Sequence, residues 1–319
     1  MPLRCAVLDD YQDVAHTLAD WSAVAPKVEV RVFQAPLGDE GAVAAALKDF
    51  EIVCLMRERT PFPRTLIEKL PALKLIVTTG LRNASIDVAA AAGRGITVCG
   101  TESAGHPTAE LTVGLMLDLA RKISFESARM KAGEPWQVTV GDDLYGKTLG
   151  IIGLGKLGSR VAKVGLAFGM KVIAWSQNLT PEKCAAAGVT YAGKEELLRQ
   201  SDFVTVHLVL SARTRGLIGA AELASMKPSA YLINTARGPI VEESALIAAL
   251  REKRIAGAAL DVFDTEPLPR DHPLRALPNA IVTPHLGYVT ADNYRQFYGQ
   301  TVEAIRGFLD GKPVRVIAP

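Results

Sequence analysis

A glycine-rich turn between a strand-like run and a helix-like run is the feature that most restricts how this chain can fold. The apolar run Leu149–Ile152 leads into Gly153-Leu-Gly155-Lys-Leu-Gly158, after which apolar residues recur at helical spacing. Gly153 permits the tight turn, Gly155 leaves space for a pyrophosphate, and Gly158 lets the helix pack closely on the strand. The free N–H groups of the first helical turn favour an anion. The run therefore predicts a dinucleotide site on a doubly wound sheet.

Strand-like and helix-like segments alternate from one end of the chain to the other, which is typical of parallel sheets with helical crossovers. Strands are expected at 4–8, 28–33, 51–56, 74–78 and 96–98, and in a second series at 148–152, 171–175, 203–207, 230–234, 257–262 and 280–283. Helices are expected at 39–49, 63–70, 86–92, 107–122, 156–168, 181–187, 194–200, 220–225, 242–252 and 290–310. Because 319 residues are too many for one ordinary core, the pattern predicts two α/β domains.

The ends of one expected helix are marked by particular residues. Ser85 is expected to be the N-cap of the helix 86–92, because serine side chains accept a hydrogen bond from the first helical turn. Gly93 is expected to end that helix in a left-handed conformation.

Composition excludes several classes of partner. The chain has 36 basic and 34 acidic side chains and a net charge of +2, so no charge excess favours nucleic acid or a membrane surface. Every apolar run is interrupted before about 20 residues, and the first run is too short for a signal peptide. The four cysteines are scattered, and no His/Cys cluster has metal-ligand spacing. We therefore expect a cytoplasmic protein without a metal site.

Polar residues follow three of the expected strands. They are Arg237 in INTARG, Glu266 in LDVFDTEP and His285 in VTPHLG. Ligands of open α/β sheets bind beyond the carboxyl ends of parallel strands, so we expect these side chains beside the glycine-rich turn.

The segments GLGKLG, INTARGPIVEESAL, ALDVFDTEPLP and TPHLG, in this order, resemble the D-isomer-specific 2-hydroxyacid dehydrogenases. That family includes glyoxylate/hydroxypyruvate reductases and phosphoglycerate dehydrogenases, and the resemblance covers nearly the whole chain. It implies hydride transfer between NAD(H) or NADP(H) and a small 2-oxo acid. It also implies a Rossmann domain at 104–288, inserted in a flavodoxin-like substrate domain formed by 1–103 and the returning helix of 289–319. A homodimer through the nucleotide domain is implied by the resemblance only.

The resemblance assigns the chemistry to Arg237, Glu266 and His285. Hydride transfer to a 2-oxo acid leaves negative charge on the carbonyl oxygen, which then takes a proton. Histidine suits this proton transfer because it titrates near working pH. A neighbouring glutamate orients the imidazole and favours its protonated form. An arginine fork can hold a carboxylate and polarise the carbonyl.

The resemblance also assigns residues to the cofactor. Asp261 would hold the nicotinamide carboxamide, and Thr108 would lie near the nicotinamide. The full set of expected cofactor-binding residues is Gly153, Gly155, Lys156, Leu157, Gly158, Ser176, His207, Thr235, Ala236, Asp261, Gly287 and Thr108.

The residues themselves leave the choice between NAD and NADP open. A carboxylate usually follows the second strand, where it holds the ribose hydroxyls of NAD. This chain has Ser176-Gln177-Asn178 there, which neither repels nor strongly attracts a 2′-phosphate.

The substrate residues are expected in the first domain and next to His285. They are Gly80, Leu81, Arg82, Arg59 and Tyr288. In the family a glycine-containing loop offers backbone N–H groups to the substrate carboxylate, and the loop of Gly80 matches it. This chain departs from the usual pattern by Arg82 and Asn83 in the loop and by the large Tyr288. The roles of Arg82 and Arg57 remain open between anion binding and solvent exposure.

Two other readings stay open. The chain could be a binding protein that senses NAD(H), like the C-terminal-binding corepressors, although it shows no added interaction tail. It could be another enzyme of this fold, such as a formate dehydrogenase, but that family has glutamine where Glu266 stands. Among hydroxy acids, the sequence does not distinguish glyoxylate, hydroxypyruvate and phosphoglycerate.

Overall fold

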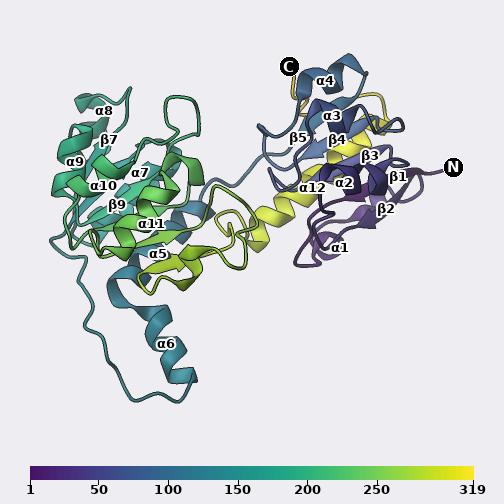
Figure 1. Ribbon diagram of the computed structural model, residues 1–319. Helices are drawn as coiled ribbons and strands as arrows, with labels where there is room; N and C mark the ends of the chain where they lie inside the picture. Colours follow the sequence, from purple (N-terminus) through teal and green to yellow (C-terminus); the bar gives the residue numbers. More distant parts are fainter. The chain divides into compact units, whose positions relative to one another are not determined.

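The computed structural model describes residues 1–319, which form two compact units (Figure 1). Unit 1 comprises Met1–Ala104 and Thr290–Pro319, and unit 2 comprises Gly105–Val289. Each unit is an α/β fold around a parallel sheet, so the predicted fold class is confirmed. None of the helices combines the length and the apolarity that spanning a membrane requires.

Unit 1 contains a five-stranded sheet in the order β2-β1-β3-β4-β5, the flavodoxin-like order. Its strands are β1 (Leu3–Val7), β2 (Val28–Val32), β3 (Ile52–Leu55), β4 (Leu75–Thr78) and β5 (Thr97–Gly100). Its helices are α1 (Ala15–Leu18), α2 (Glu40–Leu47), α3 (Arg64–Ile67), α4 (Val88–Gly93) and α12 (Ala291–Leu309), with a 3-10 turn at Trp21–Ala23. All residues of β3 and β4 are buried, as expected of strands covered by helices on both faces.

The ends of α4 differ from the prediction. Asp87, not Ser85, caps the helix, because the Asp87 carboxylate accepts the N–H of Ala90 at 2.7 Å. The backbone N–H and hydroxyl of Ser85 instead donate to the Asn83 side chain at 2.9 and 2.6 Å. Gly93 lies inside the helix, and the left-handed residue is Gly95, with φ +72°. Both predicted caps were wrong by two residues. At the N-terminal end, the turn at Asn83 uses the serine that was expected to cap the helix. At the C-terminal end, the helix continues through Gly93 before the chain turns at Gly95.

Unit 2 contains a seven-stranded sheet in the order β12-β11-β10-β9-β6-β7-β8. Its strands are β6 (Thr148–Ile152), β7 (Lys171–Trp175), β8 (Thr190–Tyr191), β9 (Phe203–Val206), β10 (Tyr231–Asn234), β11 (Gly257–Leu260) and β12 (Ala280–Val282). The strand order reverses between β6 and β9. Ligands bind at such a reversal in doubly wound folds, and the glycine-rich turn directly follows β6.

Helices cover both faces of this sheet. The helices of unit 2 are α5 (Pro107–Arg121), α6 (Ile123–Lys131), α7 (Lys156–Ala167), α8 (Pro181–Ala186), α9 (Lys194–Gln200), α10 (Ala220–Ser225) and α11 (Glu243–Arg251), with 3-10 turns at Gly238–Ile240 and Pro273–Ala276. Alternate residues of the strands enter two separate cores: Val204 and Val206 lie in one, Phe203 in the other.

Helix α6 was not predicted. None of its residues is buried. A helix that packs no face on a core needs no apolar stripe, and the sequence of α6 has no such periodicity to indicate a helix. Lys122, with φ +56°, separates it from α5. In Figure 1, α6 and the segment after it project from the rest of unit 2.

Candidate active site

The three glycines after β6 have different surroundings. Gly153 has φ +104°, and a Cβ there would lie 2.8 Å from the carbonyl oxygen of His207. A Cβ at Gly158 would lie 2.1 Å from the Gly153 carbonyl oxygen, whereas a Cβ at Gly155 would meet nothing within 4 Å. Gly153 and Gly158 therefore allow close packing of the turn, and Gly155 borders open space at the N-terminus of α7. This arrangement fits a dinucleotide whose pyrophosphate approaches the backbone of Gly155.

The other residues expected near the turn occupy several environments. The Lys156 side chain lies against Gly105, where a Cβ would come within 2.6 Å of the Lys156 Nζ. Leu157 is half-buried and packs on the apolar core. After β7, the N–H of Leu179 donates to the carbonyl of Ser176 at 3.0 Å, which closes a short turn. Gln177, inside this turn, is exposed.

His207 follows β9 beside the glycine-rich turn. Its N–H donates to the carbonyl of Ile152 at 2.8 Å, and its Nε2 is buried without a hydrogen-bond partner. Burial lowers the pKa of His207 to about 4, because a charged imidazole would lose its hydration. A neutral ring therefore stands at the sheet's strand-order reversal.

Asp261 organises the turn that carries His285. It is fully buried, and its carboxylate accepts the Thr283 hydroxyl at 2.6 Å and the N–H groups of Leu286 and Gly287 at 2.7 and 2.8 Å. Burial raises the pKa of the Asp261 carboxyl, although these three donors favour its ionised form. The carboxamide contact implied for Asp261 stays a prediction. Its contacts within the turn were not foreseen, and Thr283, one residue after β12, was missed.

The same turn holds His285 in an unusual backbone conformation. His285 has φ +53°, which non-glycine residues rarely adopt. Its N–H donates to the Thr283 carbonyl at 3.0 Å, and the carbonyl of Gly287 accepts the Thr108 hydroxyl at 2.8 Å. Tyr288 packs edge-on against the imidazole, with ring centroids 5.3 Å apart. These contacts fix the direction of the His285 side chain.

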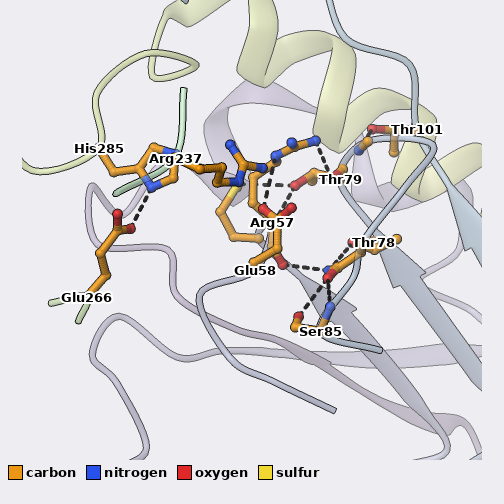
Figure 2. Close-up of polar contacts among 12 residues, drawn as sticks. Arg57, Glu58, Thr78, Thr79, Ser85, Thr101, Arg237, Glu266 and His285 are labelled. Atoms are coloured by element: carbon orange, nitrogen blue, oxygen red, sulfur yellow. Dashed lines mark hydrogen bonds and ion pairs between the residues drawn. The ribbon is translucent and has the colours of Figure 1, made fainter. Parts of the chain in front are cut away.

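Glu266 and His285 form the polar contact that bears most directly on the predicted chemistry (Figure 2). The Nδ1 of His285 lies 2.6 Å from Oε2 of Glu266, and Oε1 accepts the N–H of Phe263 at 2.9 Å. Burial disfavours a charged Glu266, but the hydrogen bond and the charge of His285 outweigh it and lower the pKa of the glutamate. Because Glu266 occupies Nδ1, Nε2 is the ring atom that can exchange a proton with a substrate.

Arg237 follows β10 in a tightly bonded turn. The N–H of Ala236 donates to the Asn234 side chain at 3.0 Å, and that amide donates to the Arg237 carbonyl at 2.9 Å. The Arg237 guanidinium donates to the Ala236 carbonyl at 2.8 Å. The buried Thr235 shares a hydrogen bond of 2.8 Å with Thr112 of α5. The turn is therefore anchored on both sides of Arg237.

In unit 1, Arg57 covers the expected anion-binding loop (Figure 2). The Arg57 guanidinium donates to the Thr79 carbonyl at 3.2 Å, and a Cβ at Gly80 would lie 2.0 Å from it. Gly80 has φ +97°, and its N–H donates to the Thr101 hydroxyl at 3.0 Å. Asn83 donates to the Arg57 carbonyl at 2.7 Å, so this departure from the family pattern braces the loop.

The remaining expected substrate residues of unit 1 divide into two groups. Leu81 and Arg82 are exposed. Arg59 donates to the carbonyl of Asp9 at 2.8 Å and lies over the ring of Tyr11, 4.4 Å from its centroid. Substrate contacts of all three stay predictions.

Comparison with known proteins identifies relatives over most of the chain. The family described as D-isomer specific 2-hydroxyacid dehydrogenase, NAD binding domain, matches residues 113–287. The D-3-phosphoglycerate dehydrogenase of Methanocaldococcus jannaschii is 41% identical over 270 residues, which cover 83% of this chain and 51% of that protein. The glyoxylate reductase of Aeropyrum pernix is 40% identical over 256 residues, covering 77% of this chain and 76% of that protein. The chain thus spans about half the length of the first relative.

Solved structures share the fold over nearly the full chain. A phosphoglycerate oxidoreductase from Vibrio cholerae has a TM-score of 0.92 and 35% identity, over 97% of this chain and 99% of that one. A D-lactate dehydrogenase from Aquifex aeolicus, complexed with NAD and lactic acid, has a TM-score of 0.77 and 28% identity, over 97% of this chain and 96% of that one.

The lowered pKa of His207 predicts an acid-sensitive fold. In the unfolded chain a histidine binds its proton near pH 6.5, whereas folded His207 does so near pH 4. The unfolded state therefore binds more protons between these values, and stability should fall as pH drops through that window. Urea unfolding of the cofactor-free protein from pH 7 to pH 4 should show a shallower decline for His207→Gln than for the wild type. Equal slopes would show that other groups cause the decline.

Proposed function

Because the chain belongs to the D-isomer-specific 2-hydroxyacid dehydrogenase family, we propose that it transfers a hydride between NAD(H) or NADP(H) and a small 2-oxo or D-2-hydroxy acid. The observation that carries this proposal is the contact of 2.6 Å between Glu266 and His285. This contact pairs a proton-transfer group, His285, with the carboxylate that orients it. Carbonyl reduction needs such a proton donor in addition to the hydride.

When bound, the nicotinamide supplies the hydride. His285, protonated and paired with Glu266, donates the proton of Nε2 to the substrate oxygen as negative charge develops there. Glu266 keeps the ring oriented and stabilises its charge, and in the reverse reaction Nε2 accepts the proton. Arg237 holds the substrate carboxylate and polarises the carbonyl with its forked guanidinium.

The cofactor residues support the same proposal. Gly155 borders the open space at the N-terminus of α7, and Asp261 and Thr108 contact the turn at Gly287. We propose that Thr235, Ala236 and His207 line the same cofactor. For unit 1, we propose that the loop of Gly80 binds the substrate carboxylate, with Arg57 as a further anion contact.

Two kinds of relative support the choice of substrate candidates. Matching proteins are named glyoxylate reductase and D-3-phosphoglycerate dehydrogenase. We therefore propose three candidate substrates: glyoxylate, hydroxypyruvate and the 2-oxo acid formed by oxidation of phosphoglycerate. A panel of these oxo acids, assayed with NADH and with NADPH, would distinguish them. The Glu266–His285 pair favours an enzyme over a corepressor-like sensor, which needs no proton donor. Absence of turnover with every member of the panel would contradict the enzyme proposal.

We also propose a homodimer formed through unit 2. Large apolar side chains are exposed along α6 and the segment after it, namely Ile123, Phe125, Met130, Trp136, Val138, Val140 and Tyr145. Such a concentration of exposed apolar groups is typical of a protein interface, and we propose a second copy as its occupant. Sedimentation velocity tests this: a monomer at micromolar concentration would refute it.

We also propose that the protein is located in the cytoplasm. Its four cysteines are free and buried, which suits a reducing compartment.

Replacing His285 tests the proton-transfer role. His285→Ala should lower kcat by about 10²–10⁴-fold in oxo-acid reduction, because the proton donor is lost. The NADH dissociation constant, measured by fluorescence titration, should stay within about threefold of wild type, because the glycine-rich turn is unchanged. A near-normal kcat would remove His285 from the mechanism.

Replacing Ser176 tests cofactor choice. The serine hydroxyl carries no charge, so wild type should use NADH and NADPH with KM values within about tenfold, or about 1.4 kcal/mol. Ser176→Asp should favour NADH strongly, because its carboxylate repels a 2′-phosphate and accepts hydrogen bonds from the ribose. The measurement is kcat/KM for both cofactors. A wild type that already rejects NADPH a thousandfold would contradict the proposed role of Ser176.

A further inference from the structure

We infer that Glu243 and His272 are positioning residues that hold the loop of Glu266 in place for proton transfer by His285. The inference rests on the proposed function. Glu266 lies in the segment between β11 and β12. Residues 264–267 of this segment belong to no helix or strand, and the Glu266 side chain is only partly buried, with 34% of its surface exposed. Proton transfer requires a fixed geometry, so contacts from elsewhere must restrain Glu266.

Glu243, the first residue of α11, contacts this segment at two places. Its Oε2 accepts the N–H of Asp264 at 3.4 Å, and its Oε1 lies 3.0 Å from Nε2 of His272. The side chains of Glu243 and His272 are largely buried, with 22% and 15% of their surface exposed. One carboxylate thus joins both sides of the Glu266 loop to a helix.

The hydrogen bonds of His272 define its tautomer. Its Nδ1 accepts the N–H of Leu274 at 3.4 Å and caps the 3-10 turn Pro273–Ala276. A nitrogen that accepts carries no proton, so Nε2 bears the hydrogen and donates it to Glu243. The imidazole therefore links the Glu243 carboxylate to the 3-10 turn.

The contacts of Glu243 lead directly to Glu266. The neighbouring N–H groups of Phe263 and Asp264 donate to two different carboxylates, Glu266 and Glu243. The backbone of Gly238, next to Arg237, packs beneath the same two residues: a Cβ there would lie 2.1 Å from the carbonyl carbon of Phe263. The loop of Glu266 is therefore held between the turn of Arg237 and the start of α11.

The charges around this site agree with a restraining role. Burial and the charge of Glu243 raise the pKa of Asp264, while the charge of Arg215 opposes the rise. Glu243 is thus kept close to a like charge, and the donors at Asp264 N–H and His272 hold it there.

The test compares Glu243→Gln and Glu266→Gln in oxo-acid reduction. A glutamine at 243 has one acceptor for two donors, so the loop should loosen. We expect kcat to fall about tenfold with the cofactor KM within about twofold. Glu266→Gln removes the negative charge beside the imidazolium, so it should move the high-pH limb of the kcat/KM profile to lower pH. Glu243→Gln should move that limb in the same direction. Glu252→Gln at the end of α11 is the matched control, because its partner is Arg254, outside the loop.

Variants of His272 test the same role by a rescue experiment. His272→Ala should lower kcat about tenfold, and His272→Gln, which retains a donor near the position of Nε2, should restore it to within about threefold. Urea unfolding checks that every variant folds. A lower kcat for Glu243→Gln with an unmoved pH limb, or a His272→Gln no better than the alanine, would overturn the positioning role. If Glu266→Gln changed neither kcat nor the high-pH limb of the kcat/KM profile, that result would contradict the proposed function itself.

Discussion

The contact between Glu266 and His285 requires two loops from neighbouring strands to meet within hydrogen-bond distance. The buried carboxylate of Asp261 holds the His285 loop through three donors. The backbone of Phe263 holds Glu266 from the other side. A contact of 2.6 Å between flexible side chains would be weak without this support, because ordering them costs conformational entropy. The proposed chemistry therefore depends on hydrogen bonds made by groups that do not react.

Sheet topology explains why these groups are neighbours. The strands β10, β11 and β12 are adjacent and parallel, so Arg237, Glu266 and His285 all follow carboxyl ends at the same edge of the sheet. The reversal between β6 and β9 places the glycine-rich turn and the neutral His207 at that edge as well. Strand order thus gathers residues that are far apart in the sequence, and the loops need only adjust their final positions.

Sequence patterns predicted the fold because they report local packing. Strand–helix alternation and the spacing of Gly153, Gly155 and Gly158 were sufficient for the two parallel sheets. Helix α6 and the two-residue strand β8 bury little, so they leave no pattern. Arg237, Glu266 and His285 could be singled out by their places after strands. The hydrogen bonds that Asp261 accepts could not be predicted, and neither could the link between Glu243 and His272. Both depend on the directions of side chains that are far apart in the sequence.

The most direct test of the account is the tautomer of His285. Nitrogen-15 spectra of histidine-labelled protein, with the signals assigned through His285→Gln, report which ring nitrogen carries the proton when the ring is neutral. We expect Nδ1 to carry the proton and to donate it to Glu266, and Nε2 to be unprotonated and to face the substrate. In Glu266→Ala this preference should disappear. A neutral ring protonated at Nε2 in the wild type would contradict the claim that Glu266 orients His285 for proton transfer.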